Sequence, residues 1–224
     1  MAEQSRQDWQ DARVGLATAS RFGDVMSFTK SGESAARKNY RAELVAERLT
    51  GQATEGYTSQ AMQWGIDTEP TAKLLYSLRN YKIIEDCDFI PHSQLMAGAS
   101  PDGKIKDENA GVEIKCPNTA THIETMRNRK VPSQYYWQIQ GQMWMTGWDY
   151  IDFVSCDPRL PEGAQLVVIR VERDKDKIAE LEAEVSNFLQ TVSDEVDFVR
   201  QQMEDRIEDR KAHSEDRTKE DRSG

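Results

Sequence analysis

The chain has 224 residues and a net charge of −10 at pH 7, from 39 acidic and 29 basic residues. This length suits one domain of moderate to large size around a single core. No run approaches the roughly 18 apolar residues of a membrane span, and the polar N-terminus lacks the apolar stretch of a signal peptide, so we expect a cytoplasmic protein.

Helical patterns dominate the first third of the chain. They predict a short helix capped by Thr18 or Ser20 and ending near Met26, a helix over residues 34–49, and a helical stretch over residues 59–78. The second should stop at Gly51. The third should be interrupted near Gly65, because Pro70 suits the first turn of a separate segment better than a helix interior.

The middle of the chain changes to short β-rich segments separated by turn residues. They predict strands over residues 81–84, 89–90, 95–99, 112–116, 150–155 and 166–171. Between them, residues 133–145 predict a helix. Helices before and after a central sheet predict a single α/β domain.

The C-terminal third predicts a long helix from Asp174 to Gln202, followed by a charged tail. Residues 205–224 contain one branched apolar residue, Ile207, and indicate a frayed helix end or a flexible segment. The domain would then span residues 1–204. From Glu172 onward there are 17 acidic and 10 basic residues, a net charge of −7. The acidity therefore lies mostly in this third and does not exclude a nucleic-acid partner.

The three cysteines and three histidines are scattered along the chain, without a CxxC motif. This spacing argues against a disulfide framework and against a zinc or iron–sulfur site. It also makes a Ser-His-Asp triad improbable, which leaves carboxylates as the candidate catalytic groups.

Two adjoining strands carry the most informative polar residues. Ser100-Pro101-Asp102-Gly103 is a turn sequence at the end of the 95–99 strand, and residues 107–111 form a second turn. The strands over 95–99 and 112–116 should therefore form a hairpin-like pair. Because side chains alternate along a strand, Glu113 and Lys115 share one face. Two carboxylates and an ammonium group meet if Asp102 lies beside them.

This trio suits metal-dependent cleavage of a phosphodiester. Carboxylate oxygens bind Mg²⁺, and two such ions about 3.5–4 Å apart can hold the attacking and leaving oxygens. A lysine beside the ions can orient or deprotonate the attacking water, because the cations lower its pKa. The spacing alone also allows an ordinary surface Glu–Lys pair, which is common in edge strands.

Pro101-Asp102 followed by Glu113-Ile114-Lys115 matches the PD-(D/E)xK nuclease motif, and its surroundings resemble lambda exonuclease and the YqaJ-type viral recombinases. The likeness runs in unchanged order over about residues 6–200. Its further motifs are Trp9 with Arg13-Val14-Gly15, Thr18-Ala19-Ser20, Trp64-Gly65 with Glu69, Cys116-Pro117, Gln138-Ile139-Gln140 before Met143-Trp144, and Asp157-Pro158-Arg159. The resemblance implies a restriction-endonuclease-like core, a central mixed sheet flanked by helices.

The resemblance also implies roles for single residues. Asp102 and Glu113 would bind catalytic Mg²⁺, with the main-chain carbonyl of Ile114 assisting, and Lys115 would activate the water. Glu69 would complete a second metal site, unless it is an ordinary solvated helix residue. Two ions would be bound per active site, and Mn²⁺ is a possible substitute.

A pocket for the 5′-phosphate of the digested strand is implied as well, lined by Arg13, Ser20 and Ser100. A guanidinium fork and two hydroxyls near a helix N-terminus are good phosphate ligands. Without such a pocket, an Arg-Val-Gly sequence and a helix-capping serine would be unremarkable.

Gln140 is assigned to the active site from its surroundings and from the resemblance. On a helical wheel it is the one polar side chain on an aromatic face, while Gln134, Gln138 and Gln142 form a stripe on another side. A buried amide needs hydrogen-bond partners, which a metal-bound water or an active-site carboxylate would supply. The alternative is a core glutamine bonded only to the backbone.

Contacts with DNA are expected from a basic cluster and from one apolar side chain. The cluster comprises Lys30, Arg37, Lys38 and Arg41, which suit phosphate contacts but equally suit a solvated helix face. Met62 matches a position where the family uses an apolar wedge to separate the two DNA strands. The alternative is that Met62 packs in the core beside its helix.

These residues predict a Mg²⁺-dependent 5′→3′ exonuclease on linear double-stranded DNA. It would release 5′-mononucleotides and leave a 3′ single strand for recombination. The resemblance adds a homotrimeric ring, a single-strand annealing protein as partner, and a phage or prophage setting in a bacterial host. The alternatives are a PD-(D/E)xK endonuclease that cuts internally, and a DNA-binding recombination module without catalysis.

Overall fold

The main sheet of the fold is mixed and five-stranded. The computed structural model describes residues 12–54 and 59–220, so Trp9 of the N-terminal motif lies outside the described residues. The strands, in spatial order, are β10 (Leu166–Glu172), β9 (Tyr150–Cys156), β8 (Ala110–Lys115), β7 (Gly103–Ile105) and β4 (Ile84–Glu85). β8 and β9 run parallel, and the other neighbours are antiparallel.

A second, three-stranded sheet brings distant parts of the sequence together. It comprises β1 (Ala17–Thr18), β6 (Ala97–Ala99) and β5 (Ile90–Pro91), with β6 in the centre and parallel to β1. A small hairpin of β2 (Phe28–Thr29) and β3 (Gly32–Glu33) precedes the helix that was predicted over residues 34–49.

The predicted pairing of the 95–99 and 112–116 strands is wrong. β6 pairs with β1 and β5, and the antiparallel partner of β8 is β7, which begins directly after Asp102. β7 has only three residues, too few for a recognisable alternation. Its first residue, Gly103, leaves space that the side chain of Ile84 fills, so the turn residue is also a strand residue.

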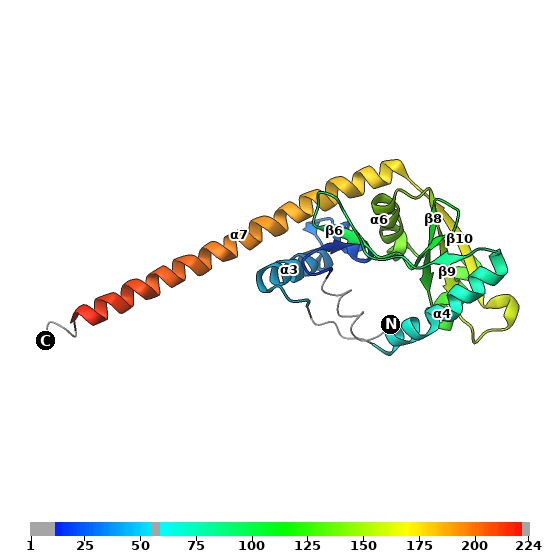
Figure 1. The fold of residues 1–224 in the computed structure, drawn as a ribbon, viewed down its shortest axis with the longest axis horizontal. Helices are drawn as coiled ribbons and strands as arrows, with labels where there is room; N and C mark the ends of the chain where they lie inside the picture. Colours follow the sequence, from blue (N-terminus) through cyan, green and yellow to red (C-terminus); the bar gives the residue numbers. More distant parts are fainter. Residues whose placement is uncertain (1–11, 55–58, 221–224) are drawn as a thin grey trace.

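Helices surround both sheets (Figure 1). They are η1 (Ala19–Arg21), α2 (Phe22–Val25), α3 (Ala35–Thr50), α4 (Gln60–Asn80), α5 (Thr119–Asn128), η2 (Ser133–Tyr135), α6 (Tyr136–Thr146), η3 (Glu162–Ala164) and α7 (Lys175–Glu220). The prediction for residues 34–49 is confirmed at both ends: the Ser34 side chain accepts a hydrogen bond from the Arg37 amide, and Gly51 ends the helix at φ +68°.

α4 and α6 cover opposite faces of the five-stranded sheet. Ala72 and Tyr76 of α4 pack in one buried cluster with Val154 and Cys156 of β9. Ile139 and Met143 of α6 pack in another with Ile151 and Phe153 of the same strand. Because successive side chains on a strand point to opposite faces, these clusters lie on opposite sides of β9. The α/β core with a central mixed sheet flanked by helices is thus confirmed.

The predicted interruption of α4 near Gly65 is wrong, since the helix is continuous and contains Pro70. A proline inside a helix leaves the carbonyl four residues earlier, here that of Ile66, without its usual donor. Ile66 is 49% exposed, so this turn of the helix is accessible to water.

α7 is longer than its sequence pattern predicted. It continues from Lys175 past Gln202 to Glu220 as one helix, and its last part projects beyond α3 (Figure 1). The buried side chains Val185, Phe188 and Val192 hold its first half in the core with α3. The second half is rich in glutamate, glutamine, lysine and arginine, which favour a helix without packing. None of the described helices is long and apolar enough to span a membrane.

Two arginines expected to contact DNA instead fasten α3 to α7. Arg37 is 4% exposed and forms ion pairs with Glu33 at 2.8 Å and with Glu184 of α7 at 2.7 Å. Arg41 pairs with Glu33 at 2.6 Å and with Glu195 of α7 at 2.7 Å. Their guanidinium groups are therefore committed within the chain, which corrects their assignment as DNA contacts.

We expect Arg37→Ala to lower the free energy of unfolding by about 3 kcal/mol, because removing one partner of a buried ion pair costs roughly 3–5 kcal/mol. The low end applies since Glu33 and Glu184 are partly exposed and can be hydrated. Urea unfolding would measure the loss. Lys38→Ala, at an exposed neighbouring position, is the matched control and should stay within about 0.5 kcal/mol of the parent. Equal urea midpoints for the Arg37 variant and the parent would contradict this role.

Candidate active site

Glu113 lies at the centre of a buried polar cluster on the face of β8 that α6 covers. Its side chain is 1% exposed. The Gln138 amide donates to Oε1 at 2.5 Å, the Gln142 amide donates to Oε2 at 2.6 Å, and Lys115 Nζ lies 2.6 Å from Oε1. The prediction that Glu113 and Lys115 share one face is therefore confirmed.

Asp102 joins this cluster through the main chain of the neighbouring residue. Its Oδ2 accepts a hydrogen bond of 2.6 Å from the amide of Ile114. The N–H and C=O of a strand residue point to the same side of the strand. The carbonyl of Ile114 is therefore also directed toward Asp102 and away from β9, as its expected role as a ligand requires.

The carboxylates of the cluster repel one another. Burial raises the pKa of Asp102 well above its ordinary value, and the nearby charge of Glu113 raises it further, against the opposing effect of Lys115. For Lys115, burial lowers the pKa, but the charges of Glu113 and Asp102 outweigh burial and raise it. The sequence analysis expected a lowered pKa for Lys115 because it assumed bound cations beside the lysine. Without cations, the two neighbouring carboxylates stabilise the ammonium form of Lys115.

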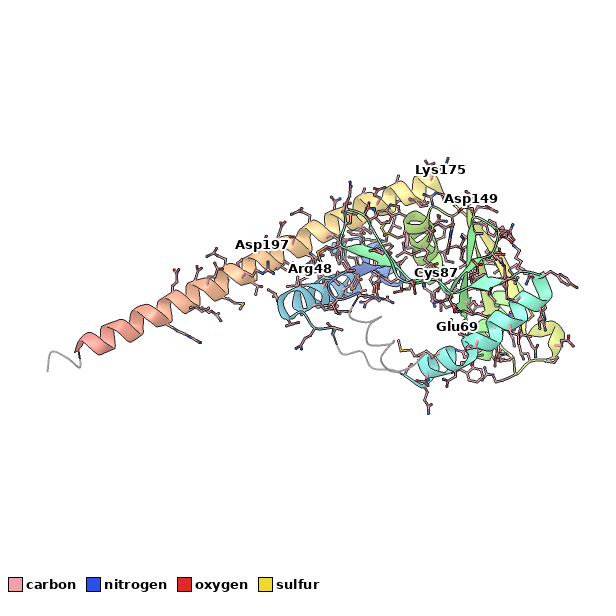
Figure 2. The ribbon with its side chains drawn as sticks, viewed as in Figure 1. Arg48, Glu69, Cys87, Asp149, Lys175 and Asp197 are labelled. Carbon is pink, nitrogen blue, oxygen red and sulfur yellow. The ribbon has the colours of Figure 1, made fainter. Side chains whose placement is uncertain are left out.

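Glu69 is a residue of α4 (Figure 2). It forms an ion pair with Lys73 at 3.1 Å, and its side chain is 35% exposed. Its charge also contributes to the raised pKa of Asp102. Glu69 is therefore close enough to act on the cluster electrostatically, yet open enough to solvent to turn toward a ligand.

The donor atoms of this cluster fit a small divalent cation. Among the described residues, no group of three or more His, Cys, Asp or Glu side chains is arranged to hold a metal ion. Mg²⁺ does not need one, since it is commonly held by one or two carboxylates, water and substrate phosphate. Asp102 Oδ1, the Ile114 carbonyl and one oxygen of Glu113 supply such a set. Three donors already use three of the roughly four acceptor sites of Glu113, so it would bind through Oε2 alone.

Gln140 does not lie in this cluster, which corrects its assignment. Its amide donates to the carbonyl of Glu172 at 3.1 Å, and its Oε1 accepts from the amide of Asp174 at 3.0 Å. It is the backbone-bonded core glutamine that the sequence left as the alternative. Gln138 and Gln142 contact Glu113 instead. The sequence signal for them was their position on one stripe of the helix.

The residues expected to bind a 5′-phosphate are brought near one another by the second sheet. Thr18 lies opposite Gly98 in parallel strands, and Ser20 in η1 and Ser100 after β6 each follow this pair by two residues. Ser20 is exposed, while Ser100 Oγ is buried and has no hydrogen-bond partner among the described residues.

Arg13, the third residue expected in the phosphate pocket, lies over the ring of Phe89. Ile90 lies opposite Ala99 in the antiparallel pair of β5 and β6, so Phe89 lies opposite Ser100. The guanidinium of Arg13 stands 5.9 Å from the centre of the Phe89 ring. The guanidinium of Arg13 therefore lies beside the β5–β6 pair that leads to Ser100.

The remaining residues expected to contact DNA are exposed. Met62 near the start of α4 is 59% exposed, and Lys30 and Lys38 are exposed as well. Met62 is thus not a helix-core residue, and both lysines are accessible to a ligand.

Solved structures that resemble this chain include a close match and a more distant one. A crystal structure of an alkaline exonuclease from Laribacter hongkongensis is 42% identical and superposes with a TM-score of 0.82, covering 89% of this chain and 98% of that one. A second structure of that enzyme, in complex with dAMP, matches equally well. A phage-related exonuclease from Haemophilus somnus 129PT is 16% identical and has a TM-score of 0.66, covering 82% of this chain and 96% of that one, which shows a shared fold.

Curated protein sequences contain no match to this chain. The family model of the YqaJ-like viral recombinase domain matches residues 8–149. This range is more than half of the chain and includes Glu69, Asp102, Glu113 and Lys115. The chain therefore belongs to the YqaJ-like viral recombinase family.

Proposed function

We propose that this protein is a Mg²⁺-dependent 5′→3′ exonuclease that digests one strand of linear double-stranded DNA. The observation that carries the proposal is the convergence of Asp102, Glu113 and Lys115 at one end of β8. The exonuclease that is 42% identical to this chain supports the reaction class, and its complex with dAMP is consistent with release of mononucleotides.

The chain's own groups would divide the work of phosphodiester hydrolysis. Bound Mg²⁺, with Mn²⁺ as a substitute and two ions per site, would supply electrostatic stabilisation of the charge that develops on the phosphate oxygens. Asp102, Glu113, the Ile114 carbonyl and Glu69 would hold the ions. Lys115, whose Nζ lies 2.6 Å from Glu113 Oε1, would orient the attacking water. Its neutral amine, which bound cations would favour over the ammonium form, would accept the proton of that water.

Gln138 and Gln142 position Glu113 in this proposal. Each amide donates to a different carboxylate oxygen, which prevents rotation of the carboxylate. Gln142 is 1% exposed, and its own Oε1 has no hydrogen-bond partner among the described residues. A buried amide acceptor left without a donor is costly, so Gln142 serves the site at the expense of its own hydrogen bonding.

The end of the DNA would be recognised through its 5′-phosphate by Arg13, Ser20 and Ser100. The buried hydroxyl of Ser100 supports this, since a phosphate oxygen would supply its missing partner. The exposure of Met62, Lys30 and Lys38 supports a wedge at the strand junction and contacts to the backbone.

The biological setting follows from the viral recombinase family. We propose a cytoplasmic phage or prophage protein whose 3′ single-stranded product is used by a single-strand annealing protein. We also propose a homotrimeric ring, which would keep the enzyme on its substrate. In this proposal residues 1–204 form the exonuclease domain and residues 205–224 form an appendage to it.

We expect Lys115→Ala to reduce digestion of a 5′-phosphorylated duplex with Mg²⁺ by at least a hundredfold, since general base catalysis contributes about 10²–10⁴-fold. End-labelled linear duplex and closed circular plasmid, incubated with the parent protein, would test polarity and cut position together. Degradation of the linear form alone is expected. Cleavage of the circle would favour an endonuclease, and an unchanged rate for Lys115→Ala would contradict its role.

The proposed phosphate pocket predicts that Arg13→Ala weakens the preference for a 5′-phosphate over a 5′-hydroxyl end. The loss of one charge-assisted contact should reduce this preference about tenfold. Initial rates on two duplexes that differ only in the end group would measure it. The same preference in variant and parent would show that Arg13 does not read the end.

The glutamine pair predicts a separation of activity from stability within one helix. Gln142→Ala should lower kcat about tenfold or more, because a hydrogen bond to a charged group is worth roughly 1.5–3 kcal/mol. Gln140→Ala, two residues away, is the matched control and should lower the urea midpoint while kcat stays near that of the parent. Equal kcat values for both variants would contradict the positioning role of Gln142.

A further inference from the structure

We propose that Arg159, held against Trp64, binds a backbone phosphate of the digested strand on the 3′ side of the scissile phosphodiester. The inference rests on the proposed function, because it assumes a DNA strand at the active site. It assigns a phosphate-binding site that lies apart from the metal-binding cluster and from the pocket for the 5′-phosphate.

The guanidinium of Arg159 is fixed by a fork of hydrogen bonds. Its Nε donates to Asp157 Oδ1 at 2.8 Å, and its Nη2 donates to Asp157 Oδ2 at 2.9 Å. The same Nη2 lies 3.0 Å from Thr119 Oγ1. Asp157 is 0% exposed, and it also accepts a hydrogen bond of 2.6 Å from Thr119. The orientation of this arginine is therefore set before any ligand arrives, which lowers the entropy cost of binding.

One edge of the guanidinium remains open. Within the part of the chain that the structure describes, Arg159 Nη1 makes no hydrogen bond, and the side chain is 50% exposed. Nη1 carries two N–H groups on a planar cation, and a phosphate oxygen is a strong acceptor for either of them. The fork with Asp157 thus leaves a phosphate-sized contact available.

Trp64 completes the platform. Its ring centre lies 4.4 Å from the central carbon of the Arg159 guanidinium, so the two planar groups are in cation–π contact. The indole Nε1 of Trp64 is buried and has no acceptor among the described residues. A donor without a partner beside a half-open guanidinium indicates an anionic ligand rather than a purely internal contact.

The position of Arg159 follows from the register of the sheet. Lys115 lies opposite Ser155 in the parallel strands β8 and β9, so Asp157 and Arg159 follow the carboxyl end of β9 at the edge where Lys115 ends β8. Along this edge Arg159 follows β9, Glu113 and Lys115 lie on β8, and Asp102 comes directly before β7. Ser100 precedes Asp102 by two residues, on the side away from Arg159.

This order gives the strand a direction. The proposed 5′-phosphate pocket and Arg159 lie on opposite sides of the metal-binding cluster. A strand held by its 5′-phosphate at Ser20 and Ser100, with its first phosphodiester at Asp102 and Glu113, continues toward Arg159. The phosphate there lies on the 3′ side of the cut.

Arg170 offers a matched control, because it makes the same type of pair elsewhere. Its Nε and Nη2 donate to the buried Asp152 at 3.0 and 3.3 Å, it lies 3.6 Å from the Tyr150 ring centre, and it is 46% exposed. Each buried aspartate keeps a second donor when its arginine is removed: Thr119 at 2.6 Å for Asp157, and Tyr76 at 2.7 Å for Asp152. Arg170 lies within β10, away from the edge where Arg159 lies.

The test compares Arg159→Gln, Arg159→Lys and Arg170→Gln in the full chain. Fluorescence anisotropy with a 5′-phosphorylated duplex in EDTA measures affinity over a range of salt concentrations. Arg159→Gln should weaken binding about tenfold and reduce the slope of log K against log salt by about one. Arg159→Lys should keep the slope but lose part of the affinity, and Arg170→Gln should match the parent in both.

A duplex with one neutral methylphosphonate, placed 3′ of the first phosphodiester of the digested strand, locates the contact. The parent should lose about tenfold in affinity for it, and Arg159→Gln should lose nothing further. Equal losses in parent and variant, or an unchanged salt slope in Arg159→Gln with the urea midpoint preserved, overturn the proposal. If the parent still digests linear duplex, the failure concerns Arg159 and leaves the proposed function standing.

Discussion

The hydrogen bond from the Ile114 amide to Asp102 is the contact on which the active site depends. β7 ends its pairing with β8 at Val112, so the main chain of Ile114 extends beyond its neighbour and needs another acceptor. Asp102, at the turn before β7, takes that place. The same bond holds one carboxylate beside β8 and directs the Ile114 carbonyl toward it. Oxygen atoms of Asp102 and Ile114 are thereby gathered at a strand edge that would otherwise be unpaired.

This arrangement is maintained against electrostatic repulsion. Glu113 and Asp102 are both removed from water and raise each other's free energy as anions, which appears as the raised pKa of Asp102. α6 offsets part of this cost through Gln138 and Gln142, and Lys115 offsets a further part. α6 is itself fixed to the β10–α7 connection by Gln140. This core glutamine therefore holds α6 to the rest of the core from the side of the helix opposite to Glu113, and it touches none of the cluster residues.

The sequence predicted features that depend on residues close together in the chain, such as strand alternation and helix caps. It missed features that depend on which elements pack together in space. Strand alternation placed Glu113 and Lys115 on one face, and the caps at Ser34 and Gly51 bounded α3. β7 is too short to show a period, so the pairing of β8 was assigned to the wrong strand. A helical wheel cannot tell which side of α6 meets a carboxylate, so Gln140 was chosen over its two neighbours.

The net charge of −10 is a poor guide to the partner of this chain. Glu184 and Glu195 are committed to Arg37 and Arg41, where they hold α7 against α3. Asp102, Glu113 and Glu69 form a cluster whose sign bound cations would reverse. Many of the acidic residues that remain follow Gln202 in the sequence, where α7 projects beyond α3 (Figure 1). The total charge of the chain is therefore the sum of ion pairs, a carboxylate cluster and an acidic helix, and it does not describe the surface near the edge of the sheet.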